Sequence, residues 1–402
     1  MAFRMIAVFC ALAGACSAGE VRYLAADGDD ANDGKTPATA WRTIERLNTG
    51  LPAGGTALLR CGDVFYGMVS VKGGIDRDHR TVVTSFGSGP KPVISCTKNL
   101  RDDPAIWRAH SMGYNQWCVD LTNPSNYTGI ASADANPGFL LVDGVVKPWR
   151  KFSRHDVNMQ WDFAGEDGLL YVHSTNNPAL LSREIRVSLN VHGMRLYSHT
   201  AVSNIAVRAT GAHGMYAGYD KTPTVDMRIT DCDFENIGGS ELVGYWNGKL
   251  RVRYGNGVEF GANCEDAVVE RCEFRGVYDV AYTMQGRPYK TGWKDVHARN
   301  CLMVDCSQAF EVWCSGAQPG VGFTRCSFTG NRTVNVGGGW GALSRPNRQA
   351  ATPLLVYSME TDTVDIDVSG NTFENVPRGL LFKSGGLDTM PPGYRIHDNI
   401  VW

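Results

Sequence analysis

Residues 268–278, VVERCEFRGVY, carry the pattern on which the fold prediction rests. Apolar and polar side chains alternate around Cys272, and a period of two is typical of a β-strand with one buried face. The pattern recurs along the second half of the chain, each time with a Cys or an Asn in the place of Cys272. The other copies are MRITDCDFENI (227–237), HARNCLMVDC (297–306), GFTRCSFTGN (322–331), IDVSGNTFENV (366–376) and YRIHDNIVW (394–402).

These recurring positions form a ladder of small side chains. Most intervals between its members are about 22 to 29 residues, the length of one turn of a solenoid of short strands. A position that accepts both Cys and Asn suits a stacked core residue, so we interpret the cysteines as packing residues, with a disulfide between neighbours as the alternative. The predicted ladder consists of Thr210, Cys232, Cys272, Cys301, Cys326, Asn371 and Asn399.

A second short strand follows most members of the ladder. Strands that recur once per turn and are joined by short connections cannot form hairpins with their own neighbours, so they stack in parallel on the next turn. The sequence therefore predicts an all-β fold, a right-handed parallel β-helix. The second strands are GVEFG (257–261), DVAYTMQ (279–285), AFEVWC (309–314), TVNVG (333–337) and GLLFK (379–383).

The N-terminal region and several central runs resemble the pectate-lyase-like superfamily of parallel β-helices. YLAADGDDANDGKTPATAWRTI (23–44) and ALLRCGDVFYG (57–67) are similar to the capped entry of such proteins, where a short helix covers the open end of the core. The runs GAHG (211–214), YGNGVEFG (254–261) and YDVAYTMQG (278–286) resemble bacterial members. The resemblance implies a β-helix over most of the chain and a carbohydrate-active protein.

Four segments are expected. A signal peptide at 1–18 is followed by an N-terminal cap and first coils at 19–136 and by a β-rich insertion at 137–187, which resembles insertions of some carbohydrate-active β-helices. The main β-helix at 188–402 carries Gly-rich loop insertions near 238–256 and 337–353.

The first 18 residues read as an export signal. Arg4 precedes an apolar run, and small residues end at Ala18, where we expect cleavage and hence a secreted or periplasmic protein. The run AGAC (13–16) approaches a lipobox, so lipoprotein anchoring is the alternative. No later apolar stretch is long enough to span a membrane.

The composition limits the classes of ligand that the protein is expected to bind. A formal net charge of -2 gives no basic field for nucleic acid, and we expect a polysaccharide or oligosaccharide partner. The acidic loop at 27–33 lacks a Glu at EF-hand spacing because Ala40 stands there, so it is predicted to be a capping turn, with calcium binding as the alternative. No other cofactor is expected.

Side-chain parity places three carboxylates on one outer face. With Val258, Phe260, Val280, Tyr282, Phe310, Val312, Val334 and Val336 pointing inward, the outward column is predicted to be Glu259, Ala281, Glu311 and Asn335. Glu259 and Glu311 would then lie two coils, about 9.6 Å, apart, with Asp279 between them about 8 Å from each. Inverting glycosidases hold their two carboxyl groups about 6.5–9.5 Å apart, so Glu259, Asp279 and Glu311 are the candidate catalytic residues.

Five further residues are candidates for substrate binding. Trp313 shares the outward parity of Glu311, and Trp340 lies in a Gly-rich run that would place its indole over a sugar ring. Arg253 and Arg345 come from the two loop insertions and suit carboxylates. His213 is a candidate base or sugar contact.

Three functions remain open at this point. The first is an inverting glycoside hydrolase. The second is a polysaccharide lyase on a uronate polymer, in which Arg345 or Arg253 neutralises the carboxylate and His213, Tyr282 or a Lys takes the proton. The third is a β-helix that binds a glycan without catalysis, since this fold hosts all three.

Overall fold

The computed structural model describes residues 19–110, 114–129, 137–218, 222–242, 252–288, 290–344, 350–383 and 389–402. The predicted export signal at 1–18 lies outside these ranges. Within them, no helix combines the length and the apolar character needed to cross a membrane.

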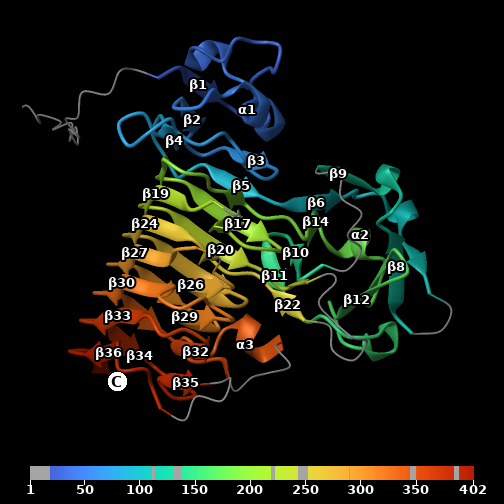
Figure 1. Ribbon diagram of the computed structural model, residues 1–402. Helices are drawn as coiled ribbons and strands as arrows, with labels where there is room; N and C mark the ends of the chain where they lie inside the picture. The colour runs from blue at the N-terminus through green and yellow to red at the C-terminus, as the bar shows by residue number, and fades with distance from the viewer. Residues whose placement is uncertain are drawn as a thin grey trace, which may run out of the picture.

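Three parallel sheets form the body of the molecule, and the strands stack from coil to coil as Figure 1 shows. Each complete coil gives one strand to sheet A, one to sheet B and one to sheet C, in that order along the chain, and each strand pairs in parallel with its equivalent in the next coil. The prediction of an all-β parallel β-helix is confirmed.

The strands are short, as expected for one side of a narrow coil. Sheet A contains β1 (Val21–Leu24), β2 (Thr56–Arg60), β4 (Thr81–Phe86), β16 (Thr200–Ser203), β19 (Thr224–Thr230), β24 (Cys264–Glu270), β27 (Gly292–Arg299), β30 (Gly322–Thr329), β33 (Val364–Ser369) and β36 (Tyr394–His397). Sheet B contains β3 (Val64–Tyr66), β5 (Val93–Ser95), β17 (Ala206–Thr210), β20 (Asp233–Ile237), β25 (Glu273–Val277), β28 (Leu302–Val304), β31 (Arg332–Val334), β34 (Thr372–Glu374) and β37 (Ile400–Val401). Sheet C contains β15 (Met194–Arg195), β18 (Met215–Ala217), β23 (Val258–Phe260), β26 (Val280–Gly286), β29 (Gln308–Cys314), β32 (Leu354–Met359) and β35 (Leu381–Lys383).

The predicted ladder lies at the turn between sheets A and B, with two corrections. Cys326 lies inside β30 opposite Ile366, and Asn331 takes the place predicted for it. Thr210 belongs to the end of β17, so it is not part of this turn. The residue before each ladder position has a positive φ, which Asn, Asp and Gly adopt most easily. Those residues are Asp231, Arg271, Asn300, Gly330, Gly370 and Asp398.

The ladder is buried from Cys232 to Asn371 and half-buried at Asn399, and its side chains bond to the backbone. The Sγ atoms of Cys232, Cys272 and Cys301 lie 3.3–3.4 Å from the carbonyl two residues earlier. Asn331 and Asn371 continue the ladder with amide hydrogen bonds. All ten cysteines in the described part of the chain are free thiols.

Sheet C differs from the prediction in one coil. TVNVG (333–337) supplies β31 of sheet B, and the strand of sheet C in that coil is β32. The inserted loop precedes β32 instead of following it, so Leu355, opposite Glu311, takes the column position predicted for Asn335. Asn335 has a φ of 53° in the turn after β31.

The N-terminal coils are closed by η1 (Pro37–Thr39) and α1 (Ile44–Gly50). Ile44 and Leu47 of α1 are buried against the first strands. In the acidic loop, Asp30 accepts hydrogen bonds from the backbone N–H groups of Arg42 and Thr43, 2.8 and 3.0 Å away. Among the residues that the structure describes, no three His, Cys, Asp or Glu side chains are placed to hold a metal ion.

An antiparallel insertion separates β5 from β15 and lies beside the coils in Figure 1. The prediction began it at residue 137, whereas its strands begin at Thr97, because the early β6 pairs with the late β14. It has its own hydrophobic core. One sheet contains β6 (Thr97–Leu100), β9 (Tyr127–Gly129), β10 (Leu140–Val142), β11 (Val145–Lys147) and β14 (Ile185–Ser188), and the other contains β7 (Arg108–Ala109), β8 (Gln116–Asp120), β12 (Phe163–Glu166) and β13 (Leu169–His173). Its helices are η2 (Pro104–Ile106), η3 (Pro124–Asn126), η4 (Arg154–Asp156) and α2 (Pro178–Leu181).

Two shorter connections leave the coils at the same place. The ribbon of β21 (Ser240–Glu241) and β22 (Arg253–Tyr254) follows β20, and α3 (Trp340–Ser344) follows β31. Like the large insertion, both start after a strand of sheet B and return at a strand of sheet C. All three therefore gather beside sheet C.

Candidate active site

Glu259 and Glu311 occupy one column on sheet C. Glu259 of β23 is opposite Thr283 of β26, and Thr283 is opposite Glu311 of β29. The two acids are therefore two strand spacings, about 9.6 Å, apart at the backbone. Ala281 was predicted at this place, but the pairing of β23 with β26 is shifted by two residues, so Thr283 is the residue opposite Glu259. Ala281 belongs to the hydrophobic core.

Asp279 lies further from this column than predicted. It immediately precedes β26, four residues before Thr283, and its backbone N–H donates to the Gly255 carbonyl at 3.2 Å. Its side chain is half-buried. Its charge still acts on Glu259, because it contributes to raising the pKa of that carboxyl.

Three N–H groups converge on one oxygen of Glu259. Oε2 accepts hydrogen bonds from Asn256 Nδ2 at 2.6 Å and from Gln285 Nε2 at 2.7 Å, and His213 Nε2 lies 3.1 Å away. The side chain is 0% exposed, and Oε1 has no hydrogen-bond partner within the described part of the chain. If the carboxyl carries a proton, Oε1 is therefore the oxygen that holds it.

This environment favours the neutral acid. Burial raises the pKa of Glu259 well above its usual range, the hydrogen bond from Gln285 opposes this effect, and the charges of Glu311 and Asp279 raise the pKa further. Glu311 is 8% exposed, so both acids of the column are shielded from bulk water. A carboxyl group held neutral near another acid is the arrangement used for general acid catalysis.

His213 is held by a second ladder at the entrance to sheet C. Nδ1 of His192 lies 3.1 Å from the backbone N of His213, Nδ1 of His213 lies 3.0 Å from the N of Asn256, and Oδ1 of Asn256 lies 3.0 Å from the N of Val280. In each case the side chain accepts from the N–H of the next coil. The two imidazole rings stack with centroids 4.9 Å apart.

These bonds fix the protonation of both histidines. Because Nδ1 accepts, the proton of each neutral ring is on Nε2, and His213 donates it to Glu259. Burial lowers the pKa of His192 to about 4 and, together with the neighbouring His192, lowers that of His213 well below its usual value. Both shifts favour the neutral forms, in which the contact between His213 and Glu259 is a hydrogen bond without an ion pair.

Aromatic side chains border the site. Tyr254 packs edge-on to His213 with centroids 5.0 Å apart, and its hydroxyl donates to Asn190 Oδ1 at 2.7 Å. Trp313 lies on the outer face opposite Gln285, with its ring 6.3 Å from that of the exposed Tyr357. Trp313 is therefore placed to contact a ligand lying along the column.

The other predicted binding residues are placed differently. Trp340 donates from Nε1 to the Gly276 carbonyl at 2.9 Å and packs against Phe139 at 5.6 Å, so its ring joins α3 to the insertion. Arg253 is buried and donates to the carbonyls of Gly239 and Pro137. Arg345 lies outside the described residues.

Comparisons with known proteins found solved structures of low similarity to this chain. No protein-family model and no curated protein matches the sequence. Among solved structures, XylC in complex with xylose is 12% identical with a TM-score of 0.44, over 88% of this chain and 65% of that one. A lacto-N-biosidase from Eubacterium ramulus is 12% identical with a TM-score of 0.42, over 95% and 68% of the two chains. A glycoside hydrolase is 10% identical with a TM-score of 0.45, over 96% of both. At these identities the likeness concerns the fold alone.

Sequence reasoning did not single out His192, Asn256, Thr283 or Gln285. A signal for the first two was present, because HGM occurs at 192–194 and 213–215 and NGV occurs at the equivalent positions 256–258. Gln285 and Thr283 had no comparable signal, since their role depends on the register between β23 and β26.

Proposed function

We propose that the protein is a secreted glycoside hydrolase that inverts the anomeric configuration of its substrate. The observation that carries this proposal is the buried Glu259, whose pKa is raised and whose Oε1 is left to hold the proton, in one column with Glu311. An acid and a carboxylate about two strand spacings apart leave room for a water molecule between the base and the sugar.

The roles of the carboxyl groups follow from their surroundings. Glu259 gives its proton from Oε1 to the glycosidic oxygen, and the three donors on Oε2 stabilise the carboxylate that remains. Glu311 takes a proton from the water that attacks the anomeric carbon from the opposite face. The charge of Asp279 helps to keep the proton on Glu259 until it is transferred. Because Glu259 is fully buried, the side chains around it have to shift before its proton reaches the substrate.

The lyase alternative has weaker support. Both ring nitrogens of His213 are engaged within the protein, and Tyr282 packs against Phe310 and Phe328 in the core. Arg253 is engaged with backbone carbonyls. These residues are therefore poorly placed to take a proton from a uronate or to neutralise its carboxylate.

The test is cleavage of a panel of oligosaccharides and polysaccharides, read by mass spectrometry, with Glu259→Gln, Asp279→Asn and Glu311→Gln as variants. We expect the two Glu variants to lose about 10²- to 10⁴-fold in kcat, since each removes one proton transfer. Glu374→Gln, at a partly exposed residue of sheet B that is paired with Arg332, is the control and keeps full activity. NMR of the first product formed shows the anomer and hence inversion.

Three outcomes contradict the proposal. Full activity in all three acid variants removes the assignment of the site. A product one water lighter than the hydrolytic one, with the absorbance of an unsaturated uronate, identifies a lyase. Tight glycan binding without any product identifies a binding protein.

A further inference from the structure

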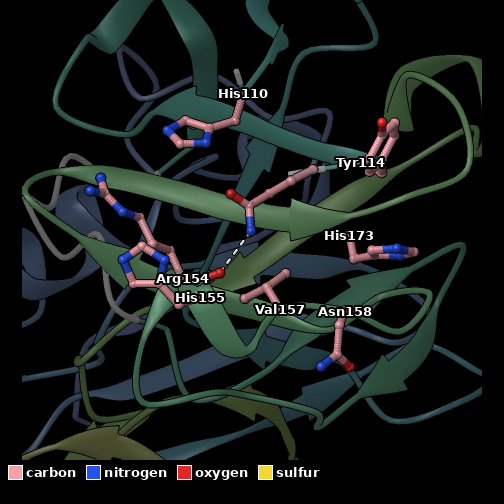
Figure 2. A pocket seen from close by; sticks show the side chains of 8 residues that line it. His110, Tyr114, Arg154, His155, Val157, Asn158 and His173 are labelled. Atoms are coloured by element: carbon pink, nitrogen blue, oxygen red, sulfur yellow. Dashed lines mark hydrogen bonds between the residues drawn. The ribbon is translucent and has the colours of Figure 1, made fainter. Parts of the chain in front are cut away.

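The insertion contains a second concave site, away from the carboxylate column. This pocket has a volume of about 350 Å³, within the range of about 300–1,000 Å³ typical of small-ligand sites. Two of its lining residues, Gln116 and Val157, are buried. In Figure 2, His110, Arg154 and His155 lie on one side of it and Tyr114, His173 and Asn158 on the other.

The walls are fixed by the surrounding strands, so the pocket exists before a ligand binds. Gln116 Nε2 donates to the Arg154 carbonyl at 2.7 Å. The backbone N–H of Arg154 donates to Glu166 Oε1 at 2.7 Å, and its Nη1 donates to the Tyr171 hydroxyl at 3.2 Å. His110 packs edge-on to the ring of Tyr171, 5.2 Å away.

Two polar atoms in the walls are unsatisfied. Nδ1 of His173 and Nε of Arg154 are shielded from solvent and have no hydrogen-bond partner within the described part of the chain. A buried nitrogen without a partner costs about 1–3 kcal/mol, so a ligand acceptor that meets one of these nitrogens, after the side chain turns towards the pocket, gains affinity.

The chemistry of the lining favours an anion on a sugar ring. Three imidazoles, one guanidinium and two amides line the pocket, and no carboxylate belongs to its described lining. Two acids lie behind the lining: Glu166 Oε2 is 3.8 Å from Arg154 Nε and offsets part of the guanidinium charge, and Asp162 Oδ2 accepts from the backbone N–H of Asn158 at 3.2 Å. Tyr114 and His155 at the rim are exposed and present flat rings, which suit the apolar face of a pyranose.

We propose that this pocket binds an acidic sugar unit, a pyranose that carries a carboxylate or a sulfate. Arg154 and His173 contact the oxyanion, and Tyr114 and His155 pack on the ring. The pocket acts as a holding site for a glycan chain and takes no part in bond cleavage. It deepens the proposed function by naming a charged glycan as ligand, and its binding does not depend on hydrolysis.

The experiment is titration calorimetry of the full-length protein with three probes. A galacturonate hexasaccharide supplies carboxylates, a carrageenan hexasaccharide supplies sulfates, and maltohexaose is neutral. We expect one of the acidic probes to bind at least 10-fold more tightly than maltohexaose, and the difference between them identifies the oxyanion. Equal affinity for all three probes overturns the proposal.

Variants locate the binding. Tyr114→Ala and His155→Ala change exposed side chains and leave the fold intact, and we expect each to weaken binding of the acidic probe at least 5-fold. His173→Phe keeps the ring and removes the nitrogen, with a larger loss. His397→Ala, an exposed histidine in the last coil, is the matched control and binds as the wild type. Wild-type affinity in the three pocket variants overturns the proposal.

Glu259→Gln separates the two proposals. If the pocket is a glycan site, this variant binds the acidic probe as the wild type does, whether or not Glu259 is the catalytic acid. Loss of binding in Glu259→Gln but not in the pocket variants assigns the ligand to the carboxylate column and overturns the pocket proposal.

Discussion

Glu259 combines two features that rarely coexist without a function. It is a fully buried carboxyl group, and its neighbours Asn256, Gln285 and His213 each direct a side-chain N–H to the same one of its two oxygens. Burying a carboxylate is costly, whereas burying a carboxylic acid with one satisfied oxygen costs much less. The neutral form is therefore part of how the site is built.

A stability measurement tests that protonation independently of activity. The raised pKa means that the folded protein holds a proton that the unfolded chain releases above about pH 4.3, so Glu259 makes the wild type less stable as the pH rises towards its folded-state pKa. Glu259→Gln mimics the neutral acid. We expect its free energy of unfolding to exceed that of the wild type at pH 8 and the difference to shrink towards pH 4, with a slope approaching ~1.4 kcal/mol per pH unit.

The control has the opposite sign. The hydrogen bond from Arg332 lowers the pKa of Glu374, so that side chain stabilises the fold above its unfolded-state pKa and the benefit is lost as the pH falls. Glu374→Gln is therefore expected to lower stability slightly at pH 8. Urea unfolding curves of both variants and the wild type at pH 5, 6.5 and 8 give the comparison. A difference between Glu259→Gln and the wild type that does not change with pH contradicts the neutral acid.

The sequence predicted the shared column of Glu259 and Glu311 because alternation along a strand is local. It did not predict that Thr283 lies between them, because the offset between β23 and β26 depends on how the chain returns from the preceding turn. For the same reason Asp279 lies four residues from the column residue of its strand, Thr283, instead of the predicted two. The hydrogen bonds that hold Glu259 come from three different coils, so the alternation along its own strand does not reveal them.

At the level of elements, the turn between sheets A and B holds the coils in register. Asn371 Oδ1 accepts from the backbone N–H of Asn331 at 2.8 Å, and its Nδ2 donates to the Phe328 carbonyl at 2.9 Å. The equivalent bond runs from the Asn371 N–H to Asn399 Oδ1 at 2.9 Å. Each Asn side chain thus satisfies one backbone N–H and one backbone carbonyl of the coil before it.

Removing one member of this ladder is expected to be costly. Asn371→Ala leaves the buried N–H of Asn331 without an acceptor and the Phe328 carbonyl without its amide donor, and we expect a loss of about 2–4 kcal/mol in the free energy of unfolding. Arg208→Ala removes an exposed ion pair with Glu235 and is expected to cost at most about 0.5 kcal/mol. Urea unfolding measures both. Equal effects of the two variants contradict a structural role for the ladder.

The ladder also shows where a sequence period is ambiguous. GFTRCSFTGN places Cys326 at the spacing of its neighbours, yet the turn falls five residues later at Asn331. The residue with positive φ, Gly330, marks the turn in the structure. Searching for an Asn, Asp or Gly directly before the repeated position would have placed this member correctly, although Arg271 would have escaped such a search.

At the scale of the whole molecule, two hydrophobic cores lie side by side. One fills the coils, and the other, containing Leu170, Phe163 and Val172, fills the insertion. The contact of Trp340 with Phe139 and the bond from Arg253 to Pro137 join the two parts. Sequence alternation alone did not reveal where the insertion begins, because β6 is paired by a strand more than eighty residues later.

Separate cores predict separate responses to a cavity. Leu170→Ala is expected to cost about 2–5 kcal/mol within the insertion, because Leu170 is fully buried there. Hydrogen exchange read by mass spectrometry should speed up in peptides from 97–188 and stay unchanged in peptides from β24 to β30. Leu180→Ala, at an exposed site in α2, is the control without effect. Faster exchange along the coils as well would mean that the two cores unfold together.

All three long connections leave the coils between sheets B and C, so insertions and deletions in them can accumulate during evolution without disturbing the coils. The separation of Glu259 and Glu311 is set by the pairing of β23, β26 and β29, which none of these connections enters. Lengthening, shortening or exchanging a connection alters what the site recognises but leaves the distance between its acids untouched. Under the proposed function, recognition and bond cleavage are thereby encoded by different parts of the chain, and a connection taken from a related coil protein is a practical route to a new specificity.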